Sequence, residues 1–320
     1  MTVLVNMIVT LGMLYVVPAG LRLIDPARLL RTARLWPLAA APGALCLWLP
    51  RGTSATALAA LYAAACLALA ARAPARLLRA RSLTPPAIAV ATALVSPSIA
   101  ATALVAERAG YRLFGFDLDI LALTVPHFHF AGFAAALVAG LVCRAVGGRA
   151  GTGGLARWAA YSVPAGTLLV LLGYFVDDWA ELLGAVVLTG GMWAVALLTW
   201  REVRPAGADR TTRTLLATSA AVLVATMLLA LWWAVGEATG ITHPTLTWMA
   251  ATHGLGNALG FALCSVLAWR RLATDARTAD RPDHRPRTTT AGLPDHRPRT
   301  TATATASTST STSDRMETSP

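Results

Sequence analysis

The sequence predicts an all-α fold, an integral membrane helical bundle with about nine transmembrane helices. Hydrophobic residues make up 56% of the chain and charged residues only 13%, about half the charged share of a soluble domain. The apolar residues form stretches of nearly the ~20 residues that cross a ~30 Å hydrocarbon core. Arginine collects in alternate connections between these stretches, as expected on the inner side of a membrane. We therefore attribute the net charge of +11 to arginines that orient the protein in the membrane. No nucleic-acid partner is expected.

Nine stretches are expected to span the membrane. They cover residues 3–24, 35–49, 54–71, 85–105, 118–143, 158–176, 180–200, 215–235 and 245–269. The second stretch is short and contains Pro37 and Pro42, which membrane helices tolerate because neighbouring helices satisfy the freed backbone groups. The first stretch lacks the basic flank and the cleavage pattern of a signal peptide, so we expect it to remain as a helix.

Arginines in the connections predict the orientation of the bundle. Four alternate connections hold fifteen arginines, whereas the intervening connections hold only Arg51, Arg108 and Arg112. The fifteen are Arg22, Arg28, Arg31, Arg34, Arg72, Arg76, Arg79, Arg81, Arg144, Arg149, Arg157, Arg201, Arg204, Arg210 and Arg213. Arginine near span ends stays on the cytoplasmic side, so the N-terminus is expected outside and the C-terminus in the cytoplasm. We expect a multi-pass protein of the plasma membrane whose partner is the lipid bilayer.

The chain is expected to divide into a transmembrane helical domain, residues 1–271, and a disordered low-complexity cytoplasmic tail, residues 272–320. Beyond Arg271 the composition changes to Thr, Ser, Pro, Arg and Asp, and the eight residues PDHRPRTT at 282–289 recur at 294–301. Such a segment has too few apolar side chains to offset the entropy of ordering. Each repeat contains one histidine, His284 or His296. Slippage that duplicated the repeat explains these histidines better than a metal site does.

Three histidines inside predicted spans are the candidate site. Ionisable or metal-liganding side chains are costly at membrane depth and are candidate functional residues there. His127 and His129 belong to the fifth stretch, and His253 belongs to the ninth. At 1.5 Å per residue, His127 lies about 13 Å from the start of its helix, and His253 lies at a similar depth. Both helices run in the same direction, so a histidine layer is expected in the outer half of the membrane.

The spacing of the histidine pair limits what it can bind. On an α-helix, residues i and i+2 point about 200° apart and share no face. His127 and His129 therefore do not ligate one metal ion unless Pro126 distorts the helix. Each is expected to face a different neighbour, and one of them is expected to meet His253. Asn257, one turn after His253, is a candidate partner of that imidazole.

Glycines near the histidines are candidates for close helix packing. They are Gly132 in the fifth stretch and Gly256 with Gly260 in the ninth, where the latter two form a small-xxx-small pattern. Small residues at these positions let two helix backbones approach.

Several functions remain open for this layer. Neutral imidazoles bind haem iron or a transition-metal ion, or relay protons. In the structural alternative, each imidazole is hydrogen-bonded across helices. A small-solute or ion transporter is a further alternative, in which outer acids such as Glu107, Asp177 and Asp178 concentrate cations above the histidines. An enzyme is the least supported class, because the sequence has no nucleophile elbow, carboxylate dyad or phosphate-binding loop.

Two sets of motifs resemble a known family. Residues 114–116 (FGF), 123–124 (LT) and 127–133 (HFHFAGF) resemble the signature of YndJ-like bacterial membrane proteins. Residues 253–254 and 257–261 resemble the second signature of that family. The resemblance implies a multi-pass membrane protein without an established biochemical role, and it covers most of the chain before the tail.

The His-Phe-His run is also similar to a helix of haem-copper oxidase catalytic subunits. In those subunits the two histidines ligate two different haems on opposite helix faces. This chain lacks their paired His-His and further copper ligands, since only His127, His129, His243 and His253 precede the tail. The similarity implies at most a bis-histidine haem site.

Overall fold

A computed structural model describes residues 2–207 and 209–279, and all of the regular structure in these residues is helical. The α-helices are α1 (Thr2–Leu11), α2 (Val17–Ile24), α3 (Leu30–Cys46), α4 (Thr53–Ala70), α5 (Arg72–Ala80), α6 (Pro85–Arg108), α7 (Leu118–His127), α8 (Ala135–Val146), α9 (Gly153–Val176), α10 (Asp178–Leu198), α11 (Arg210–Thr239), α12 (Leu246–Met249) and α13 (Cys264–Ala279). π-Helical segments are η1 (Gly12–Val16), η3 (Phe128–Ala134), η4 (Thr199–Val203), η6 (Ala250–Gly254) and η7 (Gly256–Leu263). Short 3₁₀ turns are η2 (Leu113–Gly115) and η5 (Arg204–Ala206). The predicted all-α fold is confirmed for this part of the chain.

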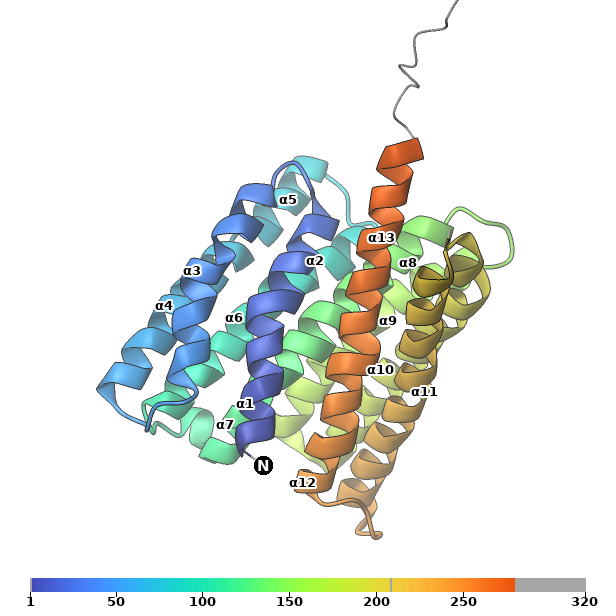
Figure 1. Cartoon of the computed structure of the whole chain (residues 1–320). Coiled ribbons are helices and arrows are strands. Elements are labelled where there is room, and N and C mark those ends of the chain that lie inside the picture. Colours follow the sequence, from blue (N-terminus) through green and yellow to red (C-terminus); the bar gives the residue numbers. More distant parts are fainter. Residues whose placement is uncertain (1, 208, 280–320) are drawn as a thin grey trace, which may run out of the picture. The chain divides into compact units, whose positions relative to one another are not determined.

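The long helices form an antiparallel bundle in which successive helices run in opposite directions (Figure 1). Eight continuous helical stretches in the described residues are long and apolar enough to cross a membrane: α1 to α2, α4 to α5, α6, α7 to α8, α9, α10 to η5, α11, and α12 to α13. Each coincides with a stretch that the sequence predicts. The protein is therefore a multi-pass membrane protein.

Helix α3 corresponds to the short second stretch. It has 17 residues, with Pro37 and Pro42 inside it, and packs against η1, α2 and α4. This length lies at the lower end of the ~17–25 residues that span a bilayer. The helix exists where the sequence predicts it, and a total of nine spans stays a prediction.

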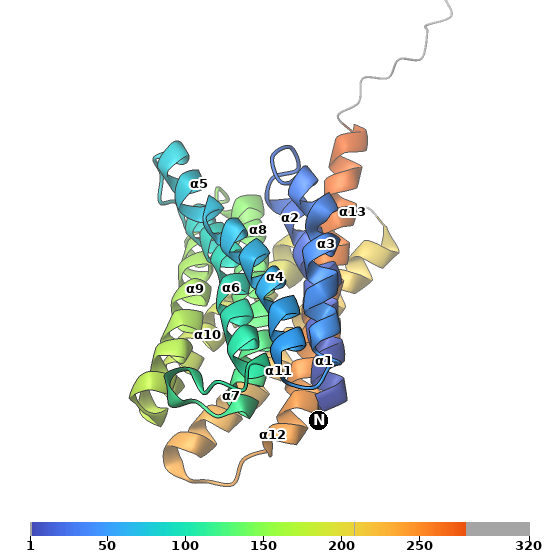
Figure 2. The same cartoon turned by 90° about the vertical axis from the view of Figure 1, so that its left-hand side faces the viewer.

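We name each span after the predicted stretch that it matches, so the fifth span is the continuous helix from α7 through η3 to α8. It is the most enclosed helix of the bundle. Of its most apolar stretch, 83% is buried inside the protein, against 28–61% in the other seven spans. Its segments contact α2, α6, α9 and α10 (Figure 2). A helix that is apolar all round is expected at the centre of a large bundle, because no polar face must reach water. The histidine pair therefore lies on the central helix.

Three spans change from α- to π-helical hydrogen bonding in the middle of the bundle. In the fifth span the N–H of Ala135 donates to the carbonyl of Phe130, and in the first span the N–H of Val17 donates to that of Gly12. In the fifth span, Pro126, which has no N–H to donate, lies two residues before η3 begins. The α-helical geometry expected from the sequence is wrong here. Segments η1, η3 and η7 contact one another, and such π segments are frequent at functional sites.

The two ends of the bundle differ in charge. The connections after α2, α5, α8 and η5 hold most of the arginines and lie at one end, which we call the arginine-rich end. The connections after α3, α6, α9 and α11 lie at the opposite end together with Thr2, and we call this the N-terminal end (Figure 1).

The predicted domain boundary lies inside a helix. Helix α13 continues to Ala279, so residues 272–279 of the predicted tail are helical. The rest of the predicted tail, with His284 and His296, lies outside the described residues.

Candidate ligand-binding site

His129 is completely buried and both of its ring nitrogens are engaged. Its Nδ1 lies 2.7 Å from the carbonyl oxygen of Val125, one turn earlier, and its Nε2 lies 2.6 Å from the hydroxyl of Tyr62 on α4. A carbonyl only accepts, so Nδ1 donates and Nε2 accepts the hydroxyl proton of Tyr62. Gly12 provides the space on the third side, because a Cβ there would lie 3.1 Å from Cβ of His129. The side chain is a neutral hydrogen-bonded link between the fifth span and α4.

His253 belongs to a closed network with α11. Its Nδ1 donates to the carbonyl of Thr226 over 2.8 Å, and its Nε2 accepts from Nδ2 of Asn257 over 3.2 Å. The hydroxyl of Thr226 then donates to Oδ1 of Asn257 over 2.9 Å. Asn257 thus contacts His253, the histidine for which it is a candidate partner in the sequence. This network joins the ninth span to α11 and leaves no lone pair of His253 free.

His127 differs from the other two histidines. Its side chain is half-buried, its ring packs edge-on against Phe128, and its Nε2 is buried without a hydrogen-bond partner in the described chain. His253 is close enough to His127 for an electrostatic interaction. The two histidines of the fifth span therefore face different neighbours.

The three histidines do not share one binding site. Within residues 2–207 and 209–279, no three His, Cys, Asp or Glu side chains lie close enough together to hold a metal ion. Ligation through Nε2 would leave the Nδ1–H bonds to the carbonyls of Val125 and Thr226 in place. It would break the bond that Nε2 of His129 accepts from Tyr62, or the bond that Nε2 of His253 accepts from Asn257. These two imidazoles therefore do not fit a bis-histidine haem site.

The candidate packing glycines lie at close helix contacts. A Cβ on Gly132 would lie 2.7 Å from Ser96 of α6. A Cβ on Gly256 or Gly260 would lie 2.8 Å from Thr226 or 2.6 Å from Val222 of α11. Real Cβ atoms are not found so close to other atoms, so any side chain here pushes the helices apart. Both histidine-bearing spans thus use glycine to approach their neighbours.

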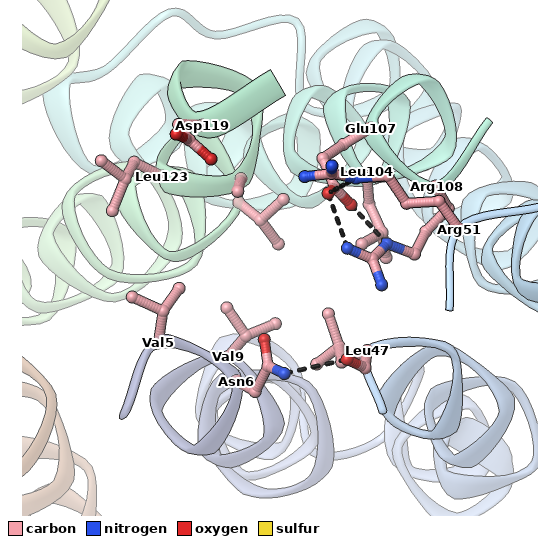
Figure 3. A pocket seen from close by; sticks show the side chains of 12 residues that line it. Val5, Asn6, Val9, Leu47, Arg51, Leu104, Glu107, Arg108, Asp119 and Leu123 are labelled. Atoms are coloured by element: carbon pink, nitrogen blue, oxygen red, sulfur yellow. Dashed lines mark hydrogen bonds and ion pairs between the residues drawn. The ribbon is translucent and has the colours of Figure 1, made fainter. Parts of the chain in front are cut away.

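A polar pocket opens at the N-terminal end of the bundle (Figure 3). Its volume is about 80 Å³, and α1, the turn after α3, α6 and α7 form its walls. The lining residues are Val5, Asn6, Val9, Leu47, Arg51, Leu104, Glu107, Arg108, Asp119, Ala122, Leu123 and Val125. This space holds several water molecules, so a small solute fits it.

Glu107 is the charged centre of one wall. It is only 2% exposed and accepts from two arginines. Nη2 of Arg108 donates to Oε1 over 2.6 Å, Nε of Arg108 donates to Oε2, and Nε of Arg51 donates to Oε1 over 2.8 Å. Arg108 also donates to the carbonyls of Cys46 and Leu49, which ties α6 to the end of α3. The buried carboxylate is fully compensated, and the cluster carries one net positive charge.

Other polar groups of the pocket have free capacity. Among the described residues, Arg51 engages only its Nε, and its side chain is 46% exposed, so its terminal NH₂ groups are available. Asp119 lies on another side of the pocket (Figure 3). Its side chain is exposed and has no ion-pair partner within residues 2–207 and 209–279. Asn6 uses its Nδ2 to donate to the carbonyl of Leu47, which leaves Oδ1 as an acceptor. The pocket therefore offers donors and acceptors of opposite charge.

The family model for YndJ-like proteins matches residues 7–261, which are more than three quarters of the chain. The chain belongs to the YndJ-like family. No curated protein and no solved structure is similar enough to match it. The matched residues include the histidines and nearly all of the pocket lining of this YndJ-like protein.

Sequence reasoning about this YndJ-like protein found the histidines and missed most of their partners. Tyr62 and Thr226 lie 67 and 27 residues from their histidines, and no local pattern connects them. Glu107 was expected near the bundle because it ends the fourth span. Its pairing with Arg51 and Arg108 was not expected, although these are two of the three arginines that interrupt the arginine-poor connections. The third, Arg112, pairs with Asp117.

Proposed function

We propose that this YndJ-like protein binds a small zwitterionic solute in the pocket at its N-terminal end, as the first step of transport across the membrane. One observation carries the proposal: unengaged NH₂ groups of Arg51 and the carboxylate of Asp119 line the same small pocket. A solute with an anionic and a cationic group would satisfy both. A solute with one charge would leave the other wall unsatisfied.

The position of the pocket also supports transport. Its floor includes Val9 and Val125, which come just before the π-helical segments of the first and fifth spans. Transporter sites are typically formed where membrane helices are interrupted near the middle of the bilayer. Movement of Val125 would be passed through its carbonyl to His129 and so to Tyr62. On this proposal, His129 couples the pocket floor to α4 without binding the solute.

Glycine is a suitable probe because it carries both charges on very few atoms. Purified protein is titrated with glycine, and separately with acetate and methylammonium, by isothermal calorimetry. Glycine should bind, and the two singly charged compounds should bind at least about tenfold more weakly, since a hydrogen bond to a charged group contributes ~1.5–3 kcal/mol. Equal binding of all three, or binding of none, would count against the proposal.

Matched variants locate the binding. Arg51→Gln and Asp119→Asn should each weaken glycine binding by about tenfold or more. Arg112→Gln is the control, because Arg112 lies at the same end but does not line the pocket. Uptake of labelled glycine into proteoliposomes then separates a transporter from a receptor that binds without transport.

A second candidate function rests on His127 alone. Its Nε2 is buried and unpaired within the described residues, so His127 could ligate haem iron or a metal ion through Nε2 without losing a hydrogen bond. A single axial histidine is a known form of haem ligation. Purified protein with a Soret band that is lost in His127→Ala would support it. Colourless, metal-free protein would remove it.

We also propose that the N-terminal end faces outside and that the membrane is the plasma membrane. The arginine-rich connections lie at the opposite end, and the three arginines at the N-terminal end are paired with Glu107 or Asp117. Orientation follows the number of arginines in the connections, and the N-terminal end has far fewer of them than the opposite end. Protease sites inserted near Arg112 and near Gly151 should be cut in intact cells only at the first position. Cleavage at the second alone would reverse the orientation.

A further inference from the structure

A second cavity lies on the other side of α7. It is a half-open groove of about 210 Å³ between α6, η2, α7 and α9. Its walls are apolar and include Ile99, Ala103, Leu121, Leu171 and Phe175.

The two threonines of the groove add no free polar group. The hydroxyl of Thr102 donates to the carbonyl of Ser98 over 2.8 Å, and that of Thr124 donates to Ile120 over 2.9 Å. Each hydroxyl is thus satisfied inside its own helix. The one other polar side chain of the lining is Tyr174, so the groove offers an occupant a single hydroxyl in an otherwise apolar surface. Such a lining favours an apolar occupant.

An aromatic cap covers the mouth of the groove. Phe116 packs edge-on against Tyr174 and Phe175, with ring centroids 6.4 and 5.2 Å apart, and Phe114 packs on Phe175 at 5.5 Å. Phe114 has φ +56° and Gly115 has φ +86°. A left-handed backbone is unfavourable for a bulky residue, so this turn stores strain. The contact with Phe175 helps to offset this cost and places the Phe114 ring at the mouth, where it is 73% exposed.

The depth of the groove identifies the environment of its occupant. Ile99 lies nine residues before Arg108, the last residue of α6. At 1.5 Å per residue the groove therefore reaches about 14 Å along the helix, nearly half of a ~30 Å hydrocarbon core. At that depth and on the flank of a membrane helix, the surrounding molecules are lipid tails.

We propose that this groove is a lipid site that holds one acyl chain of a phospholipid from the leaflet at the N-terminal end, with residues 114–116 as its cap. The rim carries the exposed pair of Arg112 and Asp117, which has no net charge. Headgroup charge should therefore matter little, and the chain should determine binding. This proposal does not depend on solute binding, because different faces of α7 line the pocket and the groove.

Native mass spectrometry tests the proposal on the purified full chain, delipidated and then supplied with dioleoyl phosphatidylcholine or dioleoyl phosphatidylglycerol. One phospholipid should be retained per chain, with less than about a threefold difference between the two headgroups. Ala103→Phe places a ring in the groove and should abolish retention. Ala60→Phe is the matched control, because Ala60 is exposed on α4 outside the groove.

Phe114→Ala provides a variant that does not disturb the core, because Phe114 is exposed. Loss of the cap should increase the rate of lipid loss at least about tenfold. Retention that is unchanged in both Ala103→Phe and Phe114→Ala would overturn the proposal. Retention that requires phosphatidylglycerol would also overturn it, since the headgroup and not the chain would then decide binding.

Discussion

The hydroxyl of Tyr62 lies 2.6 Å from Nε2 of His129, and this bond joins α4 to the central span across a completely buried contact. Because Nδ1 of His129 donates to the carbonyl of Val125, the imidazole can only accept at Nε2. Trp36 packs edge-on against the Tyr62 ring and donates its Nε1–H to the carbonyl of Met13 in η1. The π segment of the first span is thus fastened to the same cluster.

Tyr62→Phe should destabilise the protein by about 1–3 kcal/mol, because it leaves Nε2 of His129 buried without a donor. Unfolding of the purified protein in detergent, by denaturant or heat, measures the change. Tyr161→Phe is the control, because the hydroxyl of Tyr161 also donates one hydrogen bond, to the carbonyl of Leu83, but the side chain is 44% exposed. Its loss should cost less than about 0.5 kcal/mol. Equal losses in both variants would contradict a special role for the buried bond.

Thr226→Val should act through Asn257 and His253. The change keeps the side-chain volume but removes the hydroxyl that donates to Oδ1 of Asn257. A double-mutant cycle of Thr226→Val with Asn257→Ala should give a coupling of about 0.5–3 kcal/mol, as for residues in one hydrogen-bond network. The same cycle with Thr239→Val, whose hydroxyl is bonded within its own helix, should give a coupling near zero. A coupling of zero in the first cycle would mean that Thr226 and Asn257 contribute to stability independently, and would contradict the network.

The spans could be predicted from the sequence, and their local backbone could not. Each apolar stretch of sufficient length became a helix because the bilayer leaves few other ways to satisfy backbone groups. The π segments depend on contacts between the first, fifth and ninth spans, and in the sequence only Pro126 indicated a distortion. Helix α13 continues to Ala279, beyond the composition change at Arg271, so composition alone does not indicate where this helix ends.

The sequence reveals which side chains could bind a ligand, but it does not reveal which partners they contact. Polar side chains in apolar stretches are conspicuous, so the histidines and Asn257 could be found. Which nitrogen is free depends on partners such as Tyr62, which is distant in the chain. The pairing of Glu107 with Arg108 also escapes helical spacing rules, because adjacent residues on a helix do not normally face each other. The contact forms in the last turn of α6, where Arg108 turns towards the carbonyls at the end of α3.

Glu107→Gln should destabilise the protein by about 3–5 kcal/mol, because it leaves the guanidinium of Arg108 buried without a compensating charge. Asp117→Asn removes the charge of an exposed ion pair at the same end and should cost at most about 1 kcal/mol. Both variants are compared by denaturant unfolding at low and high salt. Salt should weaken only the contribution of the exposed pair. A small effect of Glu107→Gln would mean that water reaches Arg108.

Asp209 should make the stability depend on pH in the acidic range. Its carboxylate caps α11, and hydrogen bonds from the backbone N–H of Thr212 and from Arg271 lower its pKa from 3.8 to about 2. A depressed pKa in the folded state means that the stabilisation is fully present above the unfolded pKa of 3.8 and disappears as the pH falls towards about 2. Asp209→Ala should therefore be less stable than the wild type at neutral pH, and the difference should shrink as the pH falls from 3.8 through about 2. Asp209→Asn keeps a capping oxygen but no charge, so it should lose less stability than the alanine variant and show none of this pH dependence. Unfolding curves measured across this range check the sign, because parallel curves for wild type and Asp209→Ala would mean that the carboxylate titrates alike in the folded and unfolded chains.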